Sequence, residues 1–276
     1  MTPLFTSFLL ASACLCGVAP ERENDFFWEN DKFGMRAYGP GNYHVWSGFD
    51  VFNKAVDAGA TCGEVLHSHD KCGNWHVKPY KGILDNYTIG ASRGLGGIAI
   101  YADGEWKTYP NWESCEVIEQ SGDRCEFKLV YPSCCALGKM TCHITLRKGE
   151  RFFRNDVSFE FPKRIRDFRV GPGLDLEPKR DHHGEVREAC EGGLAYVSLF
   201  EDAKNEAEGS TASAIVMVGG KQPRLMTDHM NCRVIAVNSP AFTYYAGAAW
   251  SKAGEVTSAA EWRAAVDTFA ASLRGE

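Results

Sequence analysis

The 276-residue sequence lacks the features that mark several protein classes. It has no apolar run of the roughly 18 residues that a membrane-spanning helix needs, which argues against a membrane span. It has no excess of basic residues either: the net charge is −6, with both signs mixed along the chain, which argues against nucleic-acid binding. It shows no repeat and no low-complexity tract. With 44% hydrophobic and 12% aromatic residues, the chain instead has enough apolar side chains for a substantial core.

A dinucleotide-binding loop is also missing, although one stretch imitates it. Residues 90–96 read Gly-Ala-Ser-Arg-Gly-Leu-Gly, like the phosphate loop of short-chain dehydrogenases. Such a loop follows an apolar strand and opens a helix, whereas this one follows a polar turn and leads into the β-favouring run 97–101. The Tyr-x-x-x-Lys pair of those enzymes is absent. The glycines therefore indicate a loop that feeds a β-hairpin turning at Asp103-Gly104.

Short β-type runs alternate with turns along most of the chain. We expect strands at residues 33–38, 97–101, 114–119, 124–131, 140–147, 152–161, 195–200, 214–218, 233–237 and 242–248. Near the end, Ser258 and Glu261 form a capping box, and apolar residues from Trp262 to Leu273 recur on one helical face. Many strands and one closing helix predict an all-β sandwich of antiparallel sheets. No linker divides it, so residues 20–276 are expected to form a single domain.

The N-terminal stretch predicts export. Residues 4–15 are mostly apolar or small and charges begin only at Glu21, as in a secretory signal, although the basic leading region is missing. We expect residues 1–19 to be the signal peptide, and the alternative is a stray apolar segment. The small residues before Cys14 permit ordinary cleavage or a lipoprotein site. The expected location is therefore secreted or periplasmic, with a lipid anchor as one option.

Eleven cysteines fit an oxidising compartment. Nine follow the leader, and an odd number leaves at least one thiol free or paired elsewhere. Cys115 and Cys125 flank the turn at 121–123 and could lie across a hairpin. Reduced, buried cysteines that act as small apolar residues are the alternative.

Residues 39–96 are expected to form the longest irregular segment, and they hold four of the eight histidines. Long ordered loops in compact domains are often functional. One interpretation is a metal site at His67 and His69, because side chains two residues apart on a strand face the same way. The alternative is a polar loop held by hydrogen bonds and by a disulfide between Cys62 and Cys72.

A sugar site is another interpretation of the same region and its surroundings. Five tryptophans offer flat apolar faces on which pyranose rings stack: Trp28, Trp46, Trp75, Trp112 and Trp250. Three basic side chains can pair with a carboxylate: Arg36, Arg93 and Lys78. Three further side chains can act as general acid or base: Tyr43, His76 and Tyr80.

Three blocks of the sequence resemble a bacterial family known as domain of unknown function 4861. They are residues 21–40, residues 89–100, and residues 244–252 with the helix that follows. This resemblance implies a galactose-mutarotase-like β-supersandwich with a C-terminal helix, in an exported protein of bacteria that process plant or algal polysaccharides. It also implies that Ser92 and Arg93 belong to a loop beside a sugar cleft.

The chemistry implied by the resemblance is elimination by a lyase or dehydratase on uronate-containing oligosaccharides. The roles fall on candidates already named. Arg93, with Arg36, would pair with the uronate carboxylate. His76 or Lys78 would take the C5 proton, and a tyrosine, Tyr80 or Tyr43, would protonate the departing C4 oxygen. The reaction is redox-neutral, so no nicotinamide or flavin is required, and a divalent metal is an option.

The chain departs from the family at one place. The family's His-Lys-Asp-His-Gly-Glu-Gly-like run is expected before the glycine-rich loop, and here residues 75–82 read Trp-His-Val-Lys-Pro-Tyr-Lys-Gly. Only the first histidine, His76, matches. The identity of the base therefore stays open. A catalytically silent carbohydrate-binding protein and a mutarotase- or epimerase-type enzyme are the alternatives.

Overall fold

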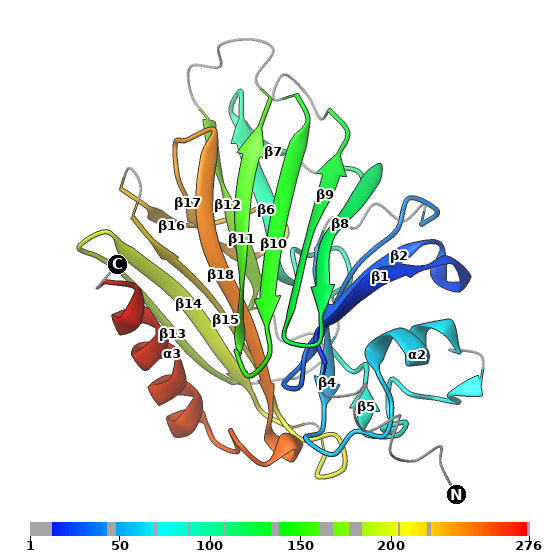
Figure 1. Ribbon diagram of the computed structural model, residues 1–276. Helices are drawn as coiled ribbons and strands as arrows, with labels where there is room; N and C mark the ends of the chain where they lie inside the picture. Colours follow the sequence, from blue (N-terminus) through cyan, green and yellow to red (C-terminus); the bar gives the residue numbers. More distant parts are fainter. Residues whose placement is uncertain are drawn as a thin grey trace, which may run out of the picture.

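The computed structural model describes residues 13–42, 48–68, 71–87, 89–107, 109–133, 138–160, 168–176, 184–203, 205–219 and 222–274. In this part of the chain the strands form one eight-stranded and two five-stranded sheets, all with antiparallel neighbours (Figure 1). The all-β architecture predicted from the strand patterns is confirmed.

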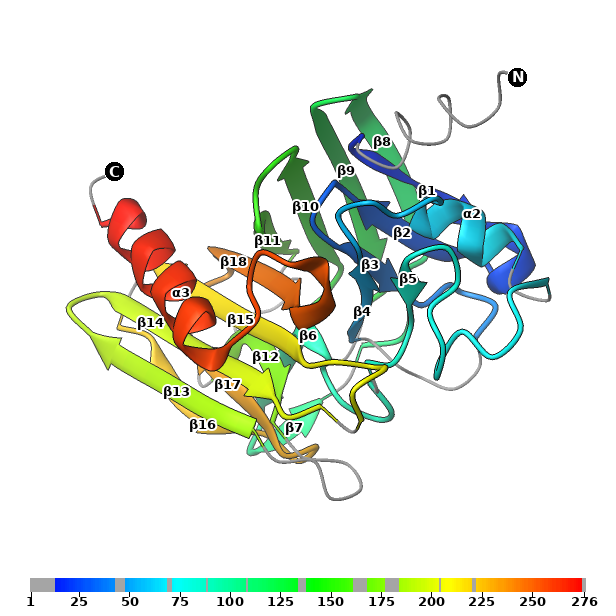
Figure 2. The same cartoon turned by 90° about the horizontal axis from the view of Figure 1, so that it is seen from below.

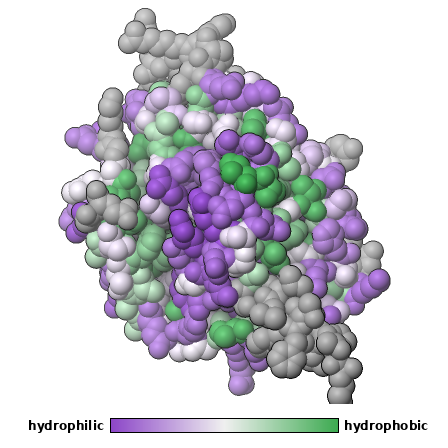
Figure 3. Space-filling view, viewed as in Figure 1, coloured by the Kyte–Doolittle hydropathy of each residue, from purple (hydrophilic) through white to green (hydrophobic). Residues whose placement is uncertain are grey.

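The eight-stranded sheet has the order β13-β14-β15-β18-β11-β10-β9-β8. Its strands are β8 (Ser114–Ser121), β9 (Arg124–Tyr131), β10 (Met140–Arg147), β11 (Phe152–Phe159), β13 (Gly184–Glu191), β14 (Leu194–Glu201), β15 (Thr211–Val218) and β18 (Ala241–Trp250). Side chains of β9 and β10 alternate between buried and partly exposed, as expected for strands with one face on the core. The face of the sheet seen in Figure 3 is largely hydrophilic.

The two smaller sheets complete the sandwich. The first has the order β1-β2-β3-β4-β5, with β1 (Leu15–Ala19), β2 (Asp25–Glu29), β3 (Gly34–Ala37), β4 (Phe49–Lys54) and β5 (Ile83–Leu84). It carries the short helices η1 (Pro20–Arg22) and α2 (Cys62–His67). The second has the order β16-β17-β12-β6-β7, with β6 (Leu95–Ala102), β7 (Glu105–Lys107), β12 (Phe168–Asp175), β16 (Arg224–Thr227) and β17 (Cys232–Ala236).

Aromatic side chains join the first sheet to the eight-stranded sheet. Trp28 on β2 is fully buried, and its ring centroid lies 5.4 Å from that of Phe127 and 5.6 Å from that of Phe153. These contacts belong to one large core to which all three sheets contribute. Burial of several aromatic rings, each worth a few kcal/mol, is a strong reason for the sheets to pack as one unit.

Helix α3 (Ala259–Leu273) follows the short helix η4 (Ser251–Ala253) and packs on strands β14 and β15 of the eight-stranded sheet (Figure 2). Its capping box is present: the Ser258 side chain accepts a hydrogen bond from the backbone N–H of Glu261. Trp262 and Val266 are buried, and the Trp262 ring stacks on Phe152 at 5.8 Å. The C-terminal helix predicted from the capping box and the apolar face is therefore confirmed.

Strand β1 overlaps the stretch expected to be the signal peptide, and that expectation stays a prediction. The strand pairs with β2 along its whole length, from Leu15 opposite Glu29 to Ala19 opposite Asp25. Removal of residues 1–19 would therefore remove an edge strand of the first sheet. Cys14, just before this strand, is fully buried. In the described part of the chain, no helix is long and apolar enough to cross a membrane.

The segment 39–96 contains more regular structure than expected, namely β4, α2 and β5. Helix α2 begins at a second capping box, formed by Thr61 and Glu64. The glycine-rich stretch leads into β6, which pairs with β7 through a turn at Asp103 and Gly104, so the predicted hairpin is confirmed. No helix follows the glycines, which excludes a dinucleotide loop there.

The nine cysteines in the described residues all have free thiols. Cys115 and Cys125 lie on the two strands of the β8–β9 hairpin, as expected, but not directly opposite each other: Cys115 faces Leu129 and Cys125 faces Gln120. Cys62 and Cys72 are also free and buried, in agreement with the alternative of reduced, apolar cysteines.

Candidate functional site

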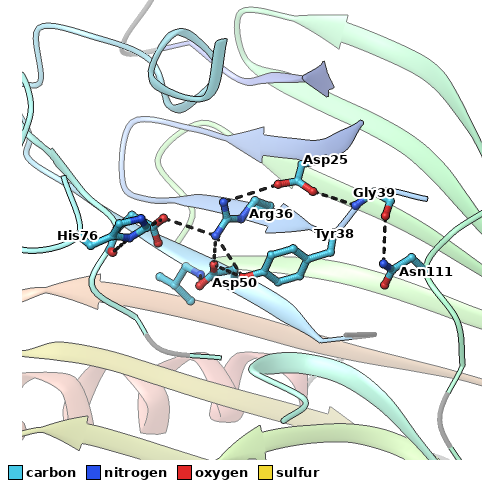
Figure 4. A network of polar contacts seen from close by, with 9 residues as sticks. Asp25, Arg36, Tyr38, Gly39, Asp50, His76 and Asn111 are labelled. Atoms are coloured by element: carbon cyan, nitrogen blue, oxygen red, sulfur yellow. Dashed lines mark hydrogen bonds and ion pairs between the residues drawn. The ribbon is translucent and has the colours of Figure 1, made fainter. Parts of the chain in front are cut away.

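A buried ionic cluster lies on the first five-stranded sheet (Figure 4). Its centre is Arg36 on β3, whose side chain is 3% exposed. The guanidinium pairs with three carboxylates, those of Asp25, Asp50 and Asp85. Nη1 lies 3.6 Å from Asp25, and Nη2 lies 3.4 Å from Asp85 and closer still to Asp50. One positive charge therefore faces three carboxyl groups in a water-poor environment.

These carboxyl groups are difficult to ionise together. Burial raises the pKa of Asp85 to about 8; Arg36 opposes this shift and repulsion from Asp50 adds to it. Burial also raises the pKa of Asp25 and, more strongly, that of Tyr38, whose hydroxyl donates a hydrogen bond to Asp50 at 2.9 Å. The cluster therefore holds a proton near neutral pH, and such perturbed groups are concentrated at functional sites.

His76 connects the cluster to the protein surface. Its Nδ1 lies 2.8 Å from the backbone oxygen of Asp85 and 3.3 Å from the Asp85 carboxylate. A carbonyl oxygen can only accept a hydrogen bond, so Nδ1 carries the proton and Nε2 carries the lone pair in the neutral ring. The His76 side chain is 55% exposed. The geometry thus presents an accessible imidazole with a defined tautomer and a buried acidic partner.

The neighbouring Trp75 fixes the position of this histidine. Its side chain is 3% exposed and stacks on Phe52, with ring centroids 5.6 Å apart. The Trp75 backbone oxygen accepts a hydrogen bond from the N–H of Asp85, and the His76 ring packs against the indole at 5.1 Å. Trp75 was expected to be a sugar-stacking platform, but the structure makes it the internal support of His76.

The other tryptophans expected as stacking faces, where the structure describes them, are buried as well. Trp28 is part of the core and has no exposed surface. Trp250 is 4% exposed, and its Nε1 donates a hydrogen bond to the backbone oxygen of Glu208. Trp112 is 5% exposed. The expectation that these indoles form exposed stacking faces is wrong, because the apolar core takes them up. Trp46 lies outside the described residues.

Arg93 is placed differently from the expectation. Its side chain has no exposed surface, its Nε pairs with Asp228 at 2.9 Å, and its Nη2 donates a hydrogen bond to the backbone oxygen of Lys107. A buried guanidinium that already has its own carboxylate is not available to a substrate carboxylate in this structure. Arg93 instead connects the glycine-rich loop to the turn between β16 and β17. Arg36 is likewise buried and matched by carboxylates.

Ser92 is also internal. It is 3% exposed, and its hydroxyl donates to the backbone oxygen of Ile89 and accepts from the N–H of Gly94. Residues 90–94 spell Gly-x-Ser-x-Gly, the pattern of a hydrolase nucleophile elbow. That elbow places an exposed serine between a strand and a helix, whereas Ser92 is buried and β6 follows it. Ser92 therefore shapes the loop and is neither nucleophile nor substrate contact.

The other basic and phenolic candidates lie on the segment that follows His76. Lys78 is exposed, and among the described residues it makes no ion pair. Tyr80 is partly exposed, with the Lys81 ammonium 5.4 Å from its ring centroid. Tyr43 lies outside the described residues. His76, Lys78 and Tyr80 thus lie on one segment at the surface, whereas Arg93 is buried.

The strand geometry on which a metal site at His67 and His69 was expected is not supported. His67 is the last residue of helix α2 and not part of a strand, and its Nδ1 lies 2.7 Å from a Glu21 carboxylate oxygen. His69 lies outside the described residues. Among the residues that the structure describes, no three metal-binding side chains come together as they would around an ion.

The acidic partners of His76 and Arg36 were missed by sequence reasoning. The sequence offers one signal: Arg36 and Asp50 stand among apolar residues that form strands, and a charge inside a buried strand requires a partner. Two surface hollows of about 450 and 310 Å³ flank helix α3, and neither is lined by a residue of the ionic cluster.

Comparisons with known proteins agree with the resemblance seen in the sequence. Residues 11–275 match the family described as "Domain of unknown function (DUF4861)". A Formosa agariphila protein named "Uncharacterized protein P7" is 26% identical over 278 residues, which cover 94% of this chain and 68% of that protein.

Two solved structures are similar to this chain over part of their own length. A candidate kojibiose phosphorylase from the human microbiome has a TM-score of 0.47 at 12% identity, over 98% of this chain and 34% of that chain. The GH36 α-galactosidase AgaB of Geobacillus stearothermophilus has a TM-score of 0.46 at 11% identity, over 88% of this chain and 42% of that chain. This chain therefore spans only a third to two fifths of these larger proteins, and likeness at this level does not transfer an activity.

Proposed function

The chain belongs to the DUF4861 family, and from that premise we propose that it is a carbohydrate-active lyase or dehydratase acting on uronate-containing oligosaccharides. The observation that supports proton abstraction is the pair formed by His76 and Asp85. The uronate substrate class rests on the family resemblance. The reaction is redox-neutral, since a proton and a leaving group are lost from adjacent carbons.

His76 is the proposed base. Its Nε2 takes the C5 proton of the uronate, and the ring becomes an imidazolium. Asp85, 3.3 Å from Nδ1, stabilises that positive charge when its carboxyl is ionised, and its backbone oxygen keeps the ring in the productive tautomer. A positioned base of this kind contributes about 10²–10⁴ in rate.

The substrate carboxylate requires a positive partner, because the C5 proton becomes acidic only when the developing enolate is stabilised. Lys78, and not Arg93, is the proposed partner of the substrate carboxylate, because the Lys78 side chain is exposed and Arg93 is buried. Tyr80, partly exposed on the same segment, is the proposed acid for the departing C4 oxygen.

The test is the appearance of the unsaturated-uronate absorbance band on incubation with uronate oligosaccharides. We expect His76→Gln to lower the rate by about 10²–10⁴. His143→Gln is the matched control, because His143 is also a partly exposed histidine paired with a carboxylate, on strand β10. A His76→Gln variant with the wild-type rate, or equal losses in both variants, would contradict the assignment.

Two other functions are separated by the same reagents. An epimerase could use the same oriented histidine, and it would exchange the C5 proton in deuterated water without forming the absorbance band. The divergence of residues 75–82 favours a binding protein without catalysis. Such a protein would bind the oligosaccharides in calorimetry and give neither signal.

A further inference from the structure

The first five-stranded sheet, which carries the ionic cluster, meets the eight-stranded sheet along β1 (Figures 1 and 2). Two hydrogen bonds define this contact. The N–H of Cys14 donates to the backbone oxygen of Gly122 at 3.0 Å, and the N–H of Cys16 donates to the Gln120 side chain at 2.9 Å. Both acceptors belong to the β8–β9 hairpin, so the start of β1 is held over the end of that hairpin.

The register of the hairpin brings a second cysteine to the same place. Gln120 on β8 lies directly opposite Cys125 on β9, and directly opposed residues point to the same face of a sheet. The hydrogen bond from the Cys16 N–H to the Gln120 side chain therefore brings Cys16 close to Cys125. Both cysteines are buried in the main core, and their thiols are in hydrogen-bond contact.

We propose that Cys16 and Cys125 form a disulfide when the chain folds in a thiol-oxidising environment, and that this bond ties the sheet carrying Arg36 to the eight-stranded sheet. Each thiol loses its hydrogen as the S–S bond forms. The two electrons and two protons pass to a disulfide oxidant such as oxidised glutathione, which becomes two glutathione thiols.

The surroundings indicate when this bond forms. The hydrogen bond between the two thiols and their burial raise the pKa of Cys125, and a thiolate is the species that attacks a disulfide. Oxidation of the folded, reduced protein is therefore slow, and the bond forms during folding, while the thiols are still exposed. Once formed, it is shielded from reductants by the same core.

The bond would close a long loop, because 109 positions separate Cys16 from Cys125. A crosslink over about 100 residues restricts the unfolded chain strongly, and for a domain of this size the expected rise in Tm is on the order of 10 °C. The stabilisation acts on the attachment of β1, the edge strand of the site-bearing sheet.

The experiment refolds the full chain with oxidised and reduced glutathione, alkylates the remaining thiols under denaturing conditions, and maps the peptides without reduction. We expect a linked pair of peptides that contain Cys16 and Cys125. We also expect reductant present during refolding to lower the Tm by about 10 °C. Cys142→Ser, a buried cysteine on the adjacent strand β10, is the control and should keep this difference.

Cys125→Ser should abolish the difference in Tm. If that variant fails to fold, the peptide map of the wild-type protein still decides the question. Alkylation of both Cys16 and Cys125 in the oxidised protein would overturn the proposal. So would a link from Cys16 to Cys14 or to Cys115.

Discussion

Replacement of Asp85 by asparagine offers the sharpest test of the ionic cluster. The Asp85 carboxyl is fully buried, and its pKa is raised from 3.8 to about 8, chiefly by burial. Between these two values the folded state holds a proton that the unfolded state has lost. The folded state therefore binds more protons, and stability falls as the pH rises through this window.

The size of the effect follows from the shift. Four pKa units correspond to at most about 6 kcal/mol, at about 1.4 kcal/mol per unit. Arg36 and Asp50 belong to the same charge network, so the titration of Asp85 is coupled to its neighbours. The expected change in the free energy of unfolding is therefore smaller than this upper limit. We expect a loss of about 3 kcal/mol in the wild-type free energy of unfolding between about pH 5 and pH 9.

Asp85→Asn places a neutral amide where the protonated carboxyl stands at low pH. This variant should lose most of that pH dependence and exceed the wild type in stability at about pH 9. Above about pH 8 it should also slow the proposed reaction, because only there does the wild type offer the His76 imidazolium an ionised Asp85 carboxylate. Urea unfolding followed by tryptophan fluorescence at a series of pH values measures the first effect.

The control for this experiment is Asp156→Asn. The pKa of Asp156 is lowered because hydrogen bonds from Arg154 and Thr243 stabilise its charged form against partial burial. A lowered pKa contributes stability at neutral pH that is lost as the pH falls, which is the opposite sign. If Asp85→Asn and the wild type show the same slope from pH 5 to 9, the buried carboxyl does not titrate as described and the reasoning is refuted.

Two further predictions concern the fold. Arg93→Ala should lower the free energy of unfolding by about 3–5 kcal/mol, because it leaves the Asp228 carboxylate buried without its partner. Urea denaturation measures this loss. A fully stable variant that has lost only activity would indicate a substrate contact instead. Ser258→Ala should lower the free energy of unfolding by about 1 kcal/mol and lower the Tm, because the Ser258 side chain caps helix α3 at the N–H of Glu261. An unchanged Tm would show that packing of the helix, and not its cap, determines its stability.

The sequence pattern predicts a strand most accurately where one face of that strand is buried and the other is partly exposed. Strands β9 and β10 were predicted to the residue, because their side chains alternate between core and surface. Strand β2 was missed, and β4 fell within the segment taken to be irregular, because every residue of both strands is buried and no period of two remains to be seen. Helix α3 was predictable from its capping box and apolar face, which are local features.

By itself, the sequence determined the all-β architecture, the C-terminal helix, the hairpin after the glycines and the position of His76 as a candidate base. These properties depend on residues that are near one another in the chain. Only the tertiary structure decided which charges are free. Arg93 finds Asp228 135 positions away, and Asp85 reaches Arg36 and His76 from the end of β5. The physical reason is burial: a charge removed from water must be matched by whatever group the packing of distant strands brings beside it.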